Sequence, residues 1–145
     1  MAKTGETFEA SDQVTVFVTD THALIYYVDQ KLTRLGKHAR RIFRNAEESK
    51  ALIYVPTVVL WEVSRRAAEG EIILSAPFDQ WCRGLDKTQG FSIAVLEWQD
   101  VDEARRLPFT DPFDCLIAGT AARLDMPLIT KDTAICESGL LETVW

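Results

Sequence analysis

The chain has 145 residues, of which 47% are hydrophobic and 26% are charged, a composition typical of one globular domain. Its formal net charge of −6 does not favour a nucleic-acid partner, because phosphate binding usually requires a basic surface. The three cysteines are far apart and form no Cys-x-x-Cys pair, which excludes a disulfide framework and a structural zinc site of the usual spacing. We therefore expect reduced thiols in a cytoplasmic protein.

Residues 1–13 are polar and slightly acidic, and we expect them to form a flexible tail ahead of a single domain at residues 14–145. The tail has no apolar stretch of signal-peptide length, and no apolar run in the chain approaches the length of a membrane span. We expect no association with a membrane.

The first predicted strand, 14–19, is rich in β-branched residues and ends at Asp20, and a helix is predicted to follow over 22–29. Gly36 begins a second predicted helix, whose apolar residues recur at the i, i+3, i+4, i+7 spacing of one helix face. These residues are Ala39, Ile42, Phe43 and Ala46.

Basic residues are concentrated in the same part of the sequence. They are Arg34, Lys37, Arg40, Arg41 and Arg44, and two more follow at Arg65 and Arg66. They are compatible with a basic surface for RNA, and equally with an ordinary solvated helix face.

The rest of the chain alternates between strand and helix signals. Strands are predicted at 52–55, 91–96 and 127–130, with a short one at 144–145, and helices at 56–69, 77–89, 100–107 and 113–124. Asp100 is predicted to cap the third of these helices, and Asp111 with Pro112 to begin the fourth. This alternation predicts an α/β fold, a three-layer α/β/α sandwich with a mainly parallel central sheet.

Several acids fall where such a sheet binds ligands, beyond the carboxyl ends of its strands. They are Asp20, Glu62, Asp111, Asp114 and Asp132. Each aspartate could instead cap a helix or begin a turn, but Glu62 lies between apolar residues in VVLWEV, where an unpaired charge is unfavourable.

Carboxylates gathered in one place repel each other, and a divalent cation removes that repulsion. An all-oxygen ligand set suits Mg²⁺ or Mn²⁺, and such an ion can activate water to hydrolyse a phosphodiester. The sequence has no P-loop and no Gly-rich dinucleotide loop, and His22, which follows Asp20 closely, could line the site.

Four segments together resemble the PIN-domain family, in particular VapC-like toxins of bacterial toxin–antitoxin pairs. The segments are 18–28 (VTDTHALIYYV), 55–74 (VPTVVLWEVSRRAAEGEIIL), 107–122 (LPFTDPFDCLIAGTAA) and 127–132 (PLITKD). The resemblance implies a PIN-like fold and an endoribonuclease dependent on Mg²⁺ or Mn²⁺, with a cognate antitoxin, an RNA substrate and a homodimeric state.

The same resemblance implies catalytic and metal-binding roles for four acids, which are Asp20, Glu62, Asp114 and Asp132. Asp20 and Asp114 would be the principal ligands, and Asp111 is a reserve candidate. Similar sequences often carry histidine and arginine where Thr110 and Cys115 stand here, so a flanking basic contribution to substrate binding is in doubt.

Two other functions stay open. A PIN-like module that only binds a partner would fit the absence of those basic neighbours. A phosphoryl-transfer protein, such as a receiver, would fit Lys131 after the last long strand, but no aspartate ends the strand at 91–96.

Overall fold

The structure is a computed structural model that describes residues 14–145, so the expected tail at 1–13 lies outside the described residues. Five strands form one sheet in the order β3-β2-β1-β4-β5, and every neighbouring pair is parallel. The strands are β1 (Thr15–Thr19), β2 (Ala51–Pro56), β3 (Phe91–Ala94), β4 (Leu128–Ile129) and β5 (Thr143–Val144). The parallel sheet confirms the fold class.

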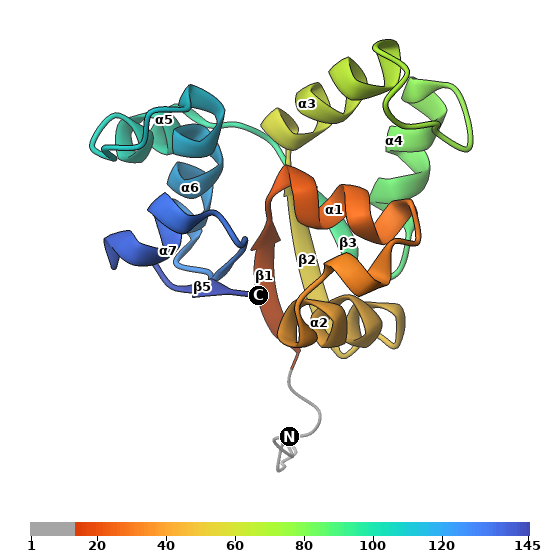
Figure 1. The fold of residues 1–145 in the computed structure, drawn as a ribbon, viewed down its shortest axis with the longest axis horizontal. Coiled ribbons are helices and arrows are strands. Elements are labelled where there is room, and N and C mark those ends of the chain that lie inside the picture. Colours follow the sequence, from red (N-terminus) through yellow and green to blue (C-terminus); the bar gives the residue numbers. More distant parts are fainter. Residues whose placement is uncertain (1–13) are drawn as a thin grey trace, which may run out of the picture.

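Helices on both sides of the sheet complete the predicted three-layer sandwich. They are α1 (Thr21–Val28), the 3₁₀ helix η2 (Leu32–Arg34), α2 (Lys37–Glu47), α3 (Thr57–Ala68), α4 (Phe78–Lys87), α5 (Trp98–Ala104), α6 (Pro112–Leu124) and α7 (Thr133–Ser138). Figure 1 shows α5, α6 and α7 grouped on one side of β1 and α1 to α4 on the other. Among residues 14–145, no helix is long and apolar enough to cross a membrane.

The order of the strands distinguishes this fold from that of a receiver domain. A receiver places its first strand between its second and third strands, whereas β1 here lies between β2 and β4. The receiver hypothesis is therefore wrong at the level of topology.

Helix α2 follows the predicted amphipathic pattern. Its four apolar residues, Ala39, Ile42, Phe43 and Ala46, are all buried. Phe43 stacks on Tyr27 with ring centroids 4.7 Å apart, and the helix packs on β2. Its basic residues consequently lie on the side away from the core.

Two local predictions need correction. Asp100 does not occupy the N-cap of α5: Glu97 does, and Asp100 is the third helical residue of a reciprocal capping box. No helix is predicted from the sequence after Asp132, whereas the structure has the six-residue helix α7 there. So short a helix has too few residues to show a hydrophobic period.

Asp100 instead joins α5 to α6 inside the protein. Its side chain is 0% exposed, and it accepts hydrogen bonds from Arg123 and from the Thr120 hydroxyl, the latter at 3.1 Å. A Cβ atom at Gly119 would lie 2.5 Å from the Asp100 carbonyl oxygen, so glycine is needed for this close approach. The buried ion pair therefore fixes the position of α6 and of the residues that begin it.

We predict that Asp100→Ala lowers the free energy of unfolding by about 2–4 kcal/mol, because Thr120 and Arg123 lose a buried acceptor. Urea denaturation followed by circular dichroism measures this. Asp102→Ala is the control: it removes a partly exposed carboxylate paired with Arg105 and Arg106 at the surface and should change stability by less than about 0.5 kcal/mol. Equal effects of the two substitutions would contradict the prediction.

Candidate functional site

A pocket of about 610 Å³ lies at the carboxyl edge of the sheet and contains every acid proposed from the sequence. Asp20 follows β1, Glu62 lies on α3, and Asp132 follows β4. Asp111 and Asp114 lie at the start of α6. Five carboxylates that are distant in sequence therefore line one pocket.

Three of these aspartates also cap helices; the alternative interpretation proposed a cap for Asp20 and Asp111, but only a turn for Asp132. The Oδ1 atom of Asp20 accepts a hydrogen bond from the Ala23 N–H at 2.8 Å at the start of α1. Asp111 accepts one from Phe113 at 2.8 Å, and Asp132 accepts one from Ile135 at 3.0 Å. Each of these bonds uses the Oδ1 atom, and a carboxylate has a second acceptor oxygen, Oδ2. An aspartate can therefore cap a helix and bind a metal ion at the same time.

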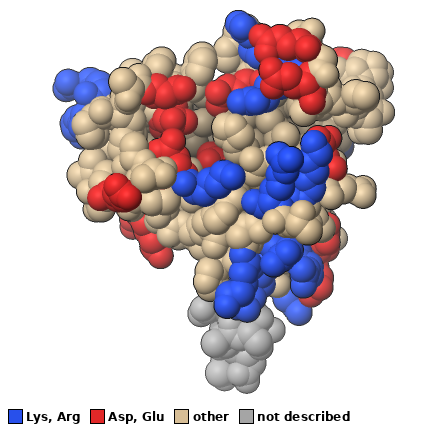
Figure 2. Space-filling view, in the orientation of Figure 1, with Lys and Arg blue, Asp and Glu red and all other residues tan. Residues whose placement is uncertain are grey.

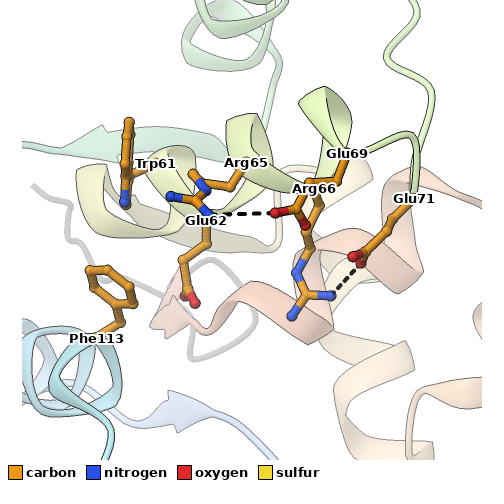
Figure 3. Close-up of a pocket in the computed structure, with 7 residues that line it drawn as sticks. All are labelled: Trp61, Glu62, Arg65, Arg66, Glu69, Glu71 and Phe113. Atoms are coloured by element: carbon orange, nitrogen blue, oxygen red, sulfur yellow. Dashed lines mark hydrogen bonds and ion pairs between the residues drawn. The ribbon is translucent and has the colours of Figure 1, made fainter.

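Glu62 is less buried than its apolar sequence neighbours suggested. The side chain is partly exposed, and its Oε1 atom accepts a hydrogen bond from the Thr21 hydroxyl across the pocket. In Figure 3 the carboxylate extends from α3 towards α1, away from the ion pairs that Arg65 and Arg66 form with Glu69 and Glu71. Thr21, directly after Asp20, thus orients Glu62 towards the other acids.

The acids shift each other's ionisation. Burial, and then the charges of Asp111, Asp132, Glu62 and Asp20, raise the pKa of Asp114 from 3.8 to about 7. Burial also raises the pKa of Asp20, although hydrogen bonds from Thr130 and Ala23 act in the opposite direction. Asp114 therefore experiences the combined negative charge of the pocket.

A divalent cation fits the chemistry of this pocket. The acids offer only oxygen donors, which Mg²⁺ and Mn²⁺ prefer, and a cation would relieve the repulsion that raises the pKa of Asp114. Within residues 14–145, no three His, Cys, Asp or Glu side chains are already close enough together to hold a metal ion. Binding would thus require the carboxylates to turn towards one another.

Polar and basic residues that the sequence analysis did not assign to the site complete the pocket. They are Thr21, Tyr26, Arg66, Lys131 and Thr133, and His22 lines it as expected. The Lys131 ammonium lies 5.3 Å from the centre of the Tyr26 ring. Lys131 and Arg66 give an acidic pocket two cationic neighbours, a combination suited to an anionic ligand held beside a metal ion.

Thr130, directly after β4, supports the site in a way that sequence spacing does not reveal. Its buried hydroxyl accepts a hydrogen bond from the Asp132 N–H at 3.1 Å and also contacts Asp20. One threonine therefore joins the acid after β1 to the acid after β4. No pattern in the sequence marked it, because a buried threonine at a strand end is common.

A second, smaller pocket of about 280 Å³ adjoins the first and shares Glu62 and Arg66 with it. Figure 3 shows Trp61 and Phe113 at one end of this pocket, on α3 and α6. Cys115 does not line either pocket: its thiol lies 3.2 Å from the Phe109 carbonyl oxygen. The residue that replaces the expected arginine thus contacts the loop before α6.

We predict that Asp114→Asn stabilises the metal-free protein by about 1–2 kcal/mol at pH 8, after allowance for solvent screening. The pKa of Asp114 is raised in the folded state, so folding favours its protonated form. The contribution of this carboxyl to stability is therefore fully present below its unfolded pKa near 4 and is lost as pH rises towards about 7. Thermal unfolding should therefore show the two proteins converging near pH 4. Glu137→Gln, outside the pocket, is the control, and a variant less stable than wild type at pH 8 would refute the prediction.

Comparison with solved structures finds the same fold in chains of three bacterial complexes. The VapBC2 complex of Rickettsia felis, bound to a DNA fragment from its promoter, gives a TM-score of 0.64 at 14% identity, with 90% of this chain and 98% of that chain covered. DNA-bound VapBC from Salmonella typhimurium gives 0.60 at 16%, covering 91% and 98%. A toxin–antitoxin complex from Klebsiella pneumoniae gives 0.57 at 19%, covering 88% and 95%.

Comparison with curated proteins gives no match. The family model described as PIN domain matches residues 17–139, which includes all five acids of the pocket. The structural matches agree with that result in fold. The chain therefore belongs to the PIN domain family.

Proposed function

We propose that this protein is a metal-dependent endoribonuclease that hydrolyses RNA phosphodiester bonds in the acidic pocket. One observation carries the proposal: five carboxylates line one pocket, and burial together with the charges of the other four raises the pKa of Asp114 to about 7. Membership of the PIN domain family supports a nuclease in general. The basic residues at the rim support an anionic substrate.

Asp20, Glu62, Asp114 and Asp132 would hold Mg²⁺ or Mn²⁺, with Asp111 beside them. The ion would lower the pKa of a bound water and stabilise negative charge on the phosphate. Thr21 orients Glu62 by its hydrogen bond. The positive N-terminal ends of α1 and α6 face the pocket through their capping aspartates and favour negative charge there. Lys131 and Arg66 would bind phosphate oxygens at the rim.

We further propose that the protein is the toxin of a cytoplasmic toxin–antitoxin pair and that an antitoxin covers the acidic pocket. The support is the fold shared with chains of toxin–antitoxin complexes, together with the acidic pocket itself. An arginine side chain of such a partner would form strong charge-assisted hydrogen bonds with these carboxylates and displace the cation.

A homodimer is part of the same proposal. Trp61, Val95 and Trp98 are 51%, 63% and 73% exposed. The Leu96 N–H donates a hydrogen bond to the Thr57 hydroxyl, which brings the segment before α5 against the start of α3. Exposed apolar residues that are close together favour a protein–protein contact.

We predict that the purified protein cleaves RNA only with Mg²⁺ or Mn²⁺ and that Asp20→Asn and Asp114→Asn each lower the rate about 100-fold or more. Cleavage of labelled RNA measures the rates, with chelator as the metal-free reference. Asp125→Asn changes an exposed carboxylate outside the pocket and serves as the control. Cleavage unchanged in both pocket variants would overturn the assigned mechanism.

We also predict that Mg²⁺ or Mn²⁺ raises the melting temperature of the wild-type protein at pH 8, because a ligand of the folded state stabilises it. The rise should be several degrees at saturating metal and much smaller in Asp114→Asn. Differential scanning fluorimetry measures it without RNA. No shift with either metal, together with stable capture of a partner protein, would favour the binding-module function.

A further inference from the structure

Most cations of this acidic protein fall into two groups. Eight Lys and Arg side chains of the described residues form ion pairs with carboxylates, on α3, α4 and α6 and in the segments that follow α1, α2 and α5. Arg34 at the end of η2, and Lys37, Arg40, Arg41 and Arg44 on α2, have no ion pair with another described residue. We call these five residues the basic face.

The basic face has a regular geometry. Lys37, Arg40, Arg41 and Arg44 follow the i, i+3, i+4, i+7 spacing, so they form one stripe along α2, opposite its buried apolar stripe. The helix has 11 residues and is therefore about 16 Å long. Figure 2 shows Lys and Arg side chains gathered over this lower part of the molecule, with acids most numerous above them and a few at the right-hand edge. Like charges so close together repel each other unless an anion lies between them.

The basic face continues into the acidic pocket. Tyr26 lines that pocket, and two cations lie over its ring: the Arg34 guanidinium at 5.9 Å and the Lys131 ammonium at 5.3 Å. Lys131 also lies 5.6 Å from the Trp145 ring. A Cβ atom at Gly36, the N-cap of α2, would lie 2.5 Å from Trp145, so that ring packs directly against the start of the helix. Cations thus extend from the pocket rim to the far end of α2.

We propose that the basic face binds the sugar–phosphate backbone of single-stranded RNA several nucleotides away from the bond that is cut. This inference rests on the proposed ribonuclease function and adds to it a substrate requirement: the RNA must extend past the pocket. Phosphates spaced along a strand match a row of cations on one helix stripe. Contacts to phosphate and sugar carry no sequence information directly, so we expect a contribution to affinity that is independent of sequence.

The test measures binding without cleavage. In the Asp114→Asn protein with Mg²⁺ present, the triple variant Lys37→Gln, Arg41→Gln, Arg44→Gln should bind a fluorescent single-stranded RNA of ~20 nucleotides about tenfold or more weakly. The slope of log affinity against log salt should fall by about 2, which corresponds to three lost phosphate contacts. Fluorescence anisotropy at several salt concentrations gives both values.

The matched control is Arg83→Gln, Arg105→Gln, Arg106→Gln, which removes the same charge from cations that are already paired. It should leave the salt slope unchanged. Equal losses in the two triple variants would overturn the proposal, because net charge alone would then explain them. Tighter binding to duplex DNA than to RNA, lost in the α2 variant, would also overturn it and assign the basic face to DNA.

A second readout separates this inference from the proposed function. With Asp114 intact, the α2 variant should raise the KM for the long RNA and leave kcat unchanged, while its cleavage of a trinucleotide should equal that of the wild-type protein. If the wild-type protein cleaves RNA and the α2 variant matches the control triple variant, only the basic-face proposal fails. If the wild-type protein neither binds nor cleaves RNA, the proposed function fails, and the basic-face proposal fails with it.

Discussion

Mutual repulsion among carboxylates at one edge of the sheet is the constraint on which the rest of this structure depends. A folded chain tolerates five acids in one pocket only where other groups compensate for their charge. Here the backbone N–H groups of α1, α6 and α7 each donate to an aspartate, and Thr21 donates to Glu62. Burial, and then the charges of the other four acids, still raise the pKa of Asp114 to about 7. The hydrogen bonds that begin three helices therefore also offset part of the charge of the pocket.

The sequence predicted much of this arrangement because its strongest local signals agree with the fold. Asp111 with Pro112 fixed the start of α6, and the apolar stripe of α2 fixed which side of that helix is buried. The position of all five acids at the carboxyl edge followed from the alternation of strands and helices. The prediction of Asp100 as an N-cap was wrong because Glu97 competes for the same role three residues earlier. Asp100 pairs with Arg123 across 23 positions, which no local pattern encodes.

The net charge of −6 argued against a nucleic-acid partner. Net charge is a poor guide to such binding here because the charged residues are unevenly distributed over the structure. Many acids line the pocket or pair with nearby cations, whereas the cations of η2 and α2 have no ion-pair partner among the described residues. A bound molecule interacts with the charges near it rather than with the net charge of the chain, because salt screens electrostatic interactions beyond roughly 10 Å. Tyr26 lies between the basic face and the acidic pocket, with Arg34 and Lys131 over its ring.

The double use of the pocket aspartates has an evolutionary consequence. Asparagine caps a helix about as well as aspartate does, and codons for the two differ by a single base. An exchange at Asp20, Asp111 or Asp132 would thus leave α1, α6 or α7 intact while removing one negative charge from the pocket. One mutational step can therefore change the charge of the pocket without loss of the fold, which leaves a stable scaffold free to acquire another role.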